Sequence, residues 1–136
     1  MKKPLPTLDD FVVYGDFDEE SAARNLLGLS TAEVSDLIQG DFLRYQEYFM
    51  FMGPVAFCFY VESMISYVLD DCDQDDFMIF HDLCEYRLDD KLAKKMTPCA
   101  ISVAECLEAY AAKLPDVSGK AVRHTAQRYR TLVELA

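Results

Sequence analysis

Residues 54–69 read PVAFCFYVESMISYVL, and this stretch is apolar on almost every side of a helix. Val61, Ile65 and Val68 lie on one apolar stripe at helical spacing, and aromatic side chains widen it. Pro54 suits the first helical position, where its missing N–H removes no hydrogen bond. A helix without a polar face is normally buried by its neighbours. We therefore expect this helix to form the centre of a helical bundle.

Helices are also predicted on both sides of this stretch. Ser30 and Glu33 form a capping box, so a helix begins at Thr31, and its apolar face continues to Phe49 unless Gly40 bends or interrupts it. Further helices are expected from Asp16 or Asp18 to Leu27, from the Asp-rich connection to about Leu88, from Pro98 after a Thr97 cap to Pro115, and from Asp116 or Ser118 onward. Residues 11–14 suggest a short extended segment. The prediction is one all-α domain over residues 1–136, an irregular bundle of five or six helices around a central apolar helix.

The composition is that of a packed globular protein. The chain has 136 residues, of which 51% are hydrophobic, and this length is enough for one core without disulfides or metal. Residues 49–69 are the nearest approach to a membrane span, but they contain Gly53, Pro54 and Glu62 and lack basic flanks. The N-terminus lacks the apolar segment of a secretory signal. We expect a soluble, cytoplasmic protein that does not enter a membrane.

The charge is strongly negative and unevenly distributed. The formal net charge is −11, and residues 1–90 hold 20 of the 24 acidic side chains but 5 of the 13 lysines and arginines. A field of this sign repels nucleic acid and anionic membranes and attracts basic partners or cations. The alternative is that acidity only keeps the protein soluble.

Two acidic clusters are the candidate contact surfaces for a basic partner. The first follows the central helix and continues into the next one; the second lies before Leu27. Their residues are Asp70, Asp71, Asp73, Asp75, Asp76, Asp82 and Glu85 in the first cluster, and Asp16, Asp18, Glu19 and Glu20 in the second. A third candidate is the last helix, where Lys120, Arg123 and Arg130 form a basic stripe, although such a stripe is more often a solvated face that attracts the acidic body.

Metal sites are not expected. If a calcium loop began at Asp71, Asp76 would occupy the position that needs glycine and Asp82 the position that needs a bidentate glutamate. His81 and Cys84 share a helix face, but zinc would need two more soft ligands, so both are expected in the core. The five cysteines form no C-x-x-C pair, and an odd number at irregular spacing predicts free thiols.

Catalytic motifs are also missing from the sequence. It contains no P-loop, no dinucleotide fingerprint, no G-x-S-x-G and no H-E-x-x-H. We therefore expect neither an enzyme nor a bound cofactor. Glu62, on the most apolar helix, is either a polar residue at the helix edge or a buried carboxylate paired with Arg44 or Arg87.

One stretch resembles a known class of proteins. Residues 48–60 read YFMFMGPVAFCFY and residues 63–67 read SMISY, and this pattern is similar to one in small acidic all-α immunity proteins of bacterial polymorphic and contact-dependent toxin systems. The resemblance covers roughly residues 25–90. It implies neutralisation of a cognate toxin by stoichiometric binding in the cytoplasm, without a cofactor. The toxin would be a basic protein, and the oligomeric state stays open.

Two other functions are compatible with the sequence. One is a general α-helical adaptor or regulatory protein, and the other is a small metal-binding or enzymatic protein. A toxin-like reading frame beside the gene would favour the immunity function over both.

Overall fold

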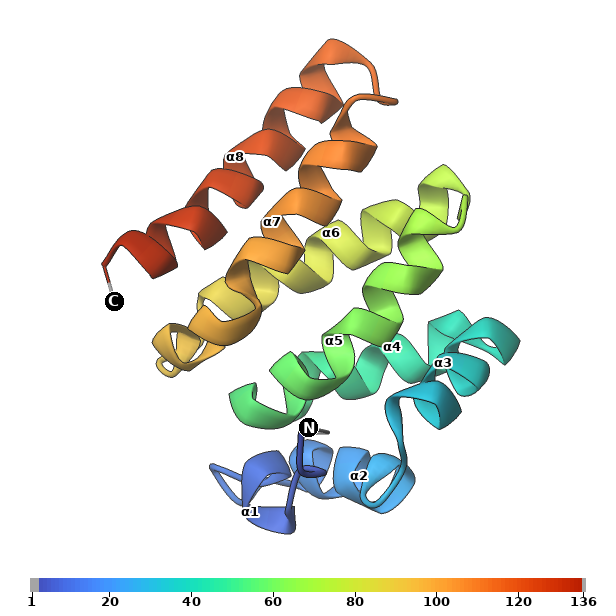
Figure 1. The fold of residues 1–136 in the computed structure, drawn as a ribbon, viewed down its shortest axis with the longest axis vertical. Helices are drawn as coiled ribbons and strands as arrows, with labels where there is room; N and C mark the ends of the chain where they lie inside the picture. The colour runs from blue at the N-terminus through green and yellow to red at the C-terminus, as the bar shows by residue number, and fades with distance from the viewer. Residues whose placement is uncertain (1–2, 136) are drawn as a thin grey trace.

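All regular elements of residues 3–135, the part of the chain that the computed structural model describes, are helices (Figure 1). They are α1 (Leu8–Phe11), α2 (Phe17–Leu26), α3 (Thr31–Gly40), α4 (Phe42–Phe51), α5 (Pro54–Leu69), α6 (Gln74–Leu88), the 3₁₀-helix η1 (Ala93–Met96), α7 (Thr97–Ala111) and α8 (Asp116–Glu134). The all-α prediction is confirmed. The described residues form more helices than the five or six expected, because short connections divide the first half of the chain further.

Local capping explains several helix starts. At α3, the Ser30 hydroxyl accepts from the Glu33 amide and the Glu33 carboxylate accepts from the Ser30 amide, so the predicted capping box is confirmed. Asp16 caps α2 in the same way. Gly28, which follows α2, has a φ of 87°, a conformation that glycine adopts without strain.

The helix that begins at Thr31 is interrupted at Gly40, as the sequence allowed; α3 ends there, and the Asp41 side chain accepts from the Arg44 amide and starts α4. Two local predictions need correction. Phe11 belongs to helix α1 and not to an extended segment, because a Thr7 capping box closes a helical turn there. Thr97 is the first residue of α7 and not its cap, since η1 runs directly into α7 and the Thr97 hydroxyl donates to the Lys94 carbonyl.

Helix α5 contacts several other elements. It packs against α1, α3, α6, α7 and η1 (Figure 1). Most side chains of α5 are buried, among them Phe57, Tyr60, Met64 and Val68, whereas Val55, Glu62, Ser66 and Leu69 leave one exposed stripe. Burying a large apolar side chain contributes about 1.5–3 kcal/mol, so this helix supplies much of the hydrophobic stabilisation.

The entry into α5 depends on a close backbone contact. The Gly53 amide donates to the Phe11 carbonyl at 2.9 Å. A Cβ atom at Gly53 would collide with the Asp10 carbonyl oxygen and lie 2.9 Å from a Val13 methyl group. The glycine between α4 and α5 is therefore what lets α1 cover the start of α5.

Helices α7 and α8 form an antiparallel pair at the opposite end from α1 and α2 (Figure 1). Arg130 of α8 makes a bidentate ion pair with Glu108 of α7, at 2.6 and 2.9 Å. The Tyr110 ring of α7 stacks on Phe77 of α6, with ring centroids 3.8 Å apart. The ion pair joins the two helices to each other, and the stacked rings fasten α7 to α6.

Candidate protein-binding surface

The exposed side of α6 is acidic. The exposed residues of this helix are Gln74, Asp75, Asp82, Glu85 and Tyr86. Spacings of seven and three residues place Asp75, Asp82 and Glu85 along one face, which we name the α6 acidic face. The only arginine of α6, Arg87, is buried, so no lysine or arginine of this helix is exposed there.

The turn before α6 is partly structural. The Asp73 carboxylate caps α6 by accepting from the Asp76 amide at 2.8 Å. The Asp76 carboxylate accepts from the Tyr67 hydroxyl at 2.6 Å, and this hydrogen bond is the main reason that the pKa of Tyr67 is raised. Asp70 and Asp71 are exposed, and their carboxylates accept no hydrogen bond within residues 3–135. Asp71 has a φ of 63°, in the left-handed region. Of the predicted contact residues in this turn, Asp73 and Asp76 also hold the fold.

The calcium hypothesis can be examined on the same turn. A calcium loop that begins at Asp71 would keep its first nine positions largely outside a helix. Here α6 begins at Gln74, the fourth position of such a loop. Asp75 and Asp76 therefore have helical backbone, which does not direct their oxygen atoms toward one central ion. This geometry favours the capping role that the sequence offered as the alternative.

One residue of the second acidic cluster, Glu19, is buried. Glu19 is 2% exposed, and its carboxylate accepts from the amides of Val13, Tyr14 and Asp16 at 2.8, 2.8 and 3.2 Å. Glu19 thus holds the loop between α1 and α2 and is not available to a partner. Asp16, Asp18 and Glu20 remain exposed.

The fold separates the turn of the first acidic cluster from the second cluster. The turn at Asp70–Asp76 precedes α6, whereas Asp16 lines a small pocket with Arg87 and Asp90 at the other end of this helix. At 1.5 Å per residue, α6 separates them by about 20 Å. The other end of the first cluster is nearer, because Tyr86, which follows Glu85, lines the same pocket as Asp16.

A shallow apolar groove lies beside the second cluster, and the sequence did not predict it. It has a volume of about 400 Å³ and runs between α1 and α2. It is lined by Leu8, Asp9, Val12, Glu20, Ala23, Arg24 and Leu27. The apolar members come from two short helices, so the groove arises only when these helices pack together.

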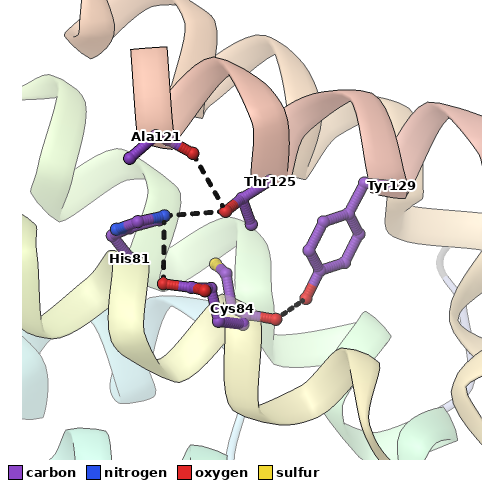
Figure 2. Close-up of polar contacts among 6 residues, drawn as sticks. His81, Cys84, Ala121, Thr125 and Tyr129 are labelled. Atoms are coloured by element: carbon purple, nitrogen blue, oxygen red, sulfur yellow. Dashed lines mark hydrogen bonds and ion pairs between the residues drawn. The ribbon is translucent and has the colours of Figure 1, made fainter. Parts of the chain in front are cut away.

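His81 connects α6 to α8 (Figure 2). The Thr125 hydroxyl donates to the Ala121 carbonyl at 3.3 Å, so it accepts from His81 Nε2, 2.8 Å away. We therefore assign the proton to Nε2, whereas the buried Nδ1 has no hydrogen-bond partner in the described part of the chain. Glu85 Oε1 lies 3.4 Å from the same Nε2.

This histidine also belongs to the one group of metal-type ligands found in residues 3–135. Ligand atoms of His81, Asp82 and Glu85 lie within 4.8 Å of one another. A metal at Nε2 would displace the proton donated to Thr125 and move it to Nδ1, which is buried without an acceptor. The arrangement therefore favours a link between helices over a metal site. As predicted, His81 and Cys84 are buried.

Arg87, and not Glu62, is the buried charge near α5. Glu62 is exposed and forms no ion pair with Arg44 or Arg87. The Arg87 guanidinium donates to the carbonyls of Met50 and Met52 at 3.1 and 2.6 Å and lies over the Phe57 ring. Burial lowers the pKa of Arg87. This side chain satisfies carbonyls at the C-terminal end of α4, which have no partner within that helix.

The chain was compared with models of known protein families, with curated protein sequences and with solved structures, and no match was found. Within residues 3–135, no helix has both the length and the apolar character needed to cross a lipid bilayer.

Proposed function

We propose that this protein neutralises a cognate secreted bacterial toxin by stoichiometric binding, and that the toxin domain is basic. The observation that carries the proposal is the α6 acidic face, where Asp75, Asp82 and Glu85 lie exposed without an exposed cation of the same helix. Opposite charge accelerates the encounter of two proteins and selects among partners. The immunity-type pattern at residues 48–60 supports the same function.

The α6 acidic face also offers an aromatic contact. Tyr86 is 49% exposed and follows Glu85 directly. Its ring lies edge-on to Phe51 of α4, with centroids 6.3 Å apart, so part of the side chain is already ordered. Tyrosine is enriched among residues that dominate binding energy, whereas exposed charges mainly set the rate of association. In this proposal Tyr86 contributes to the affinity, and the carboxylates increase the association rate.

The test uses the product of the neighbouring gene as the partner. The triple variant Asp75→Lys, Asp82→Lys, Glu85→Lys is compared with the wild type by association kinetics at low and physiological ionic strength. None of the three residues caps a helix, but Asp75 lies in the first turn of α6 and Glu85 lies beside His81, so thermal unfolding checks that the variant keeps the fold. Association should slow by at least about tenfold, and its dependence on salt should weaken.

A matched variant separates a local contact from overall charge. Asp36, Glu47 and Glu62 are exposed on α3, α4 and α5, and their reversal to lysine changes the net charge equally. If both triple variants associate at the same rate, the α6 acidic face is not the contact surface. The groove between α1 and α2, with Asp16, Asp18 and Glu20 near it, is then the next candidate.

The outcome also distinguishes the alternative function. An adaptor or regulatory protein would bind a partner whose activity the complex retains. A toxin bound but still active would therefore favour the adaptor. Failure to bind the neighbouring product at micromolar concentration would contradict the immunity proposal.

A further inference from the structure

Two cysteines from different helices meet at one carbonyl group. Cys58 lies on α5 and Cys99 lies in the first turn of α7, and these helices pack against each other. The Cys58 thiol donates to the Met96 carbonyl oxygen at 3.6 Å, and the Cys99 thiol donates to the same oxygen at 3.3 Å. A shared acceptor places both sulfur atoms on the same side of the α5–α7 contact.

The surroundings of the pair make the two thiols unequal. When Cys58 is ionised, the Cys99 S–H can donate to its sulfur instead of to the Met96 carbonyl, and this hydrogen bond lowers the pKa of Cys58. The charges of Arg87 and Lys3 act in the same direction, and burial acts against them. The pKa of Cys99 is raised, first by its hydrogen bond with Cys58 and then by burial. Cys58 is partly exposed, whereas Cys99 is 3% exposed. A partly exposed thiol with a lowered pKa beside a second thiol is the arrangement of peroxide-sensitive cysteines.

Cys72 provides a comparison within the same chain. It is also partly exposed, but burial and the charges of Asp76 and Asp73 raise its pKa to about 11. The remaining two cysteines, Cys84 and Cys106, are buried, and burial raises the pKa of each. Cys58 is therefore the thiol with both access and a favourable electrostatic environment.

We propose that Cys58 and Cys99 form a peroxide-responsive dithiol, in which Cys58 is oxidised first and Cys99 then closes a disulfide between α5 and α7. The Cys58 thiolate attacks one oxygen of hydrogen peroxide, the O–O bond breaks, and the leaving hydroxide takes the thiol proton as water. The sulfur of Cys99 then attacks the sulfenic sulfur of Cys58, the S–O bond breaks, and a second water leaves. Two thiols are oxidised by two electrons, and one peroxide is reduced to two waters.

The first test is differential alkylation of the unmodified, folded protein. The pKa of Cys58 is lowered and that of Cys72 is raised to about 11, so Cys58 holds the larger thiolate fraction at neutral pH. The lower intrinsic nucleophilicity of the more acidic thiol offsets only part of this advantage. Peptide mapping after brief iodoacetamide treatment should show Cys58 modified faster than Cys72. Equal rates, or a faster Cys72, would contradict the proposed environment.

The second test is oxidation by hydrogen peroxide, followed by intact mass and peptide mapping. The wild type should lose two hydrogens and yield a Cys58–Cys99 linked peptide that a thiol reductant cleaves. Cys58→Ser should abolish the linkage. Cys99→Ser should stop at a sulfenic acid on Cys58, which a 1,3-dione traps. Cys72→Ser, the matched control, should behave as the wild type.

A variant that folds poorly does not prevent the test, because the linked peptide from the wild-type protein alone shows whether Cys58 and Cys99 form a disulfide. A linkage between other cysteines, or oxidation of Cys58 to sulfinic acid without a linked peptide, would overturn the proposal. This proposal does not depend on the proposed toxin binding.

Discussion

Glu19 and Glu33 occupy the same position in two similar sequence patterns, yet the structure uses them differently. Each is three residues after its helix cap and accepts from the amide of that cap. Glu33 is exposed, whereas Glu19 is buried and also accepts from the amides of Val13 and Tyr14. Glu19 therefore caps its helix and also holds the loop between α1 and α2, because the backbone of that loop folds over its carboxylate.

At this scale we predict the effect of Glu19→Gln. Glutamine has nearly the same shape, but its NH₂ group would face backbone amides that now donate to a carboxylate. The free energy of unfolding should fall by about 1–3 kcal/mol, measured by urea denaturation. Glu20→Gln is the control, because Glu20 is exposed in the same first turn and carries the same charge near the helix dipole. An equal change in both variants would show that Glu19 acts only through its charge.

Between elements, Gly53 determines how closely α1 approaches α5. Gly53→Ala would push a methyl group against the Asp10 carbonyl and should lower the free energy of unfolding by about 1–3 kcal/mol. The matched substitution is Gly40→Ala, at the end of α3, where a Cβ meets nothing within 4 Å. That change should stabilise the protein by up to about 1 kcal/mol. Thermal or urea unfolding of the two variants checks both signs, and destabilisation by Gly40→Ala alone would contradict this account.

The pair formed by α7 and α8 carries a pH-dependent contact. The hydrogen bonds from Arg130 hold the pKa of Glu108 below its usual value. A lowered pKa in the folded state gives stability that is complete above the usual pKa, near 4.3, and is lost as the pH falls through the lower folded value. Both side chains are about one third exposed, at 34% and 38%, so the contribution at neutral pH is up to about 1 kcal/mol.

We therefore expect Glu108→Gln to destabilise the protein at pH 7 but not at a pH below the folded pKa of Glu108. Urea unfolding of the wild type and the variant across the acid range measures the difference. Glu105→Gln is the control, since Glu105 is exposed on the same helix and forms no ion pair within residues 3–135. A difference between wild type and Glu108→Gln that does not change with pH would exclude the ion pair as its source.

For the whole molecule, charge repulsion should be measurable in the absence of any partner. The net charge is −11, and the described residues contain only three ion pairs, one of which involves His81. Screening should therefore remove more repulsion than attraction, so the melting temperature should rise from low to physiological ionic strength. Sodium and potassium chloride should act equally. The less negative variant with Asp75, Asp82 and Glu85 changed to lysine should show a smaller rise, and a fall in the wild type would contradict the prediction.

The sequence by itself determined the helical class and most helix starts. The caps at Asp16 and Ser30 and the proline at the start of α5 act between residues at most a few positions apart, so their effect can be read without a fold. The largely apolar character of residues 54–69 likewise predicted burial, and most of α5 is buried, although Glu62 and Ser66 lie on one exposed stripe of this helix. The apolar spacing continues across Asp41, so the sequence left open whether Gly40 interrupts the helix, and the structure shows that it does.

Only the tertiary structure decided which of these side chains lie together. His81 and Thr125 are 44 positions apart, and Cys58 and Cys99 meet only because α5 packs against the start of α7. The burial of Glu19 depended on a neighbouring loop, which no periodicity records. The physical reason is range: capping and periodicity depend on neighbours within a turn or two, whereas burial, tautomer and thiol reactivity depend on groups that packing brings from distant parts of the chain.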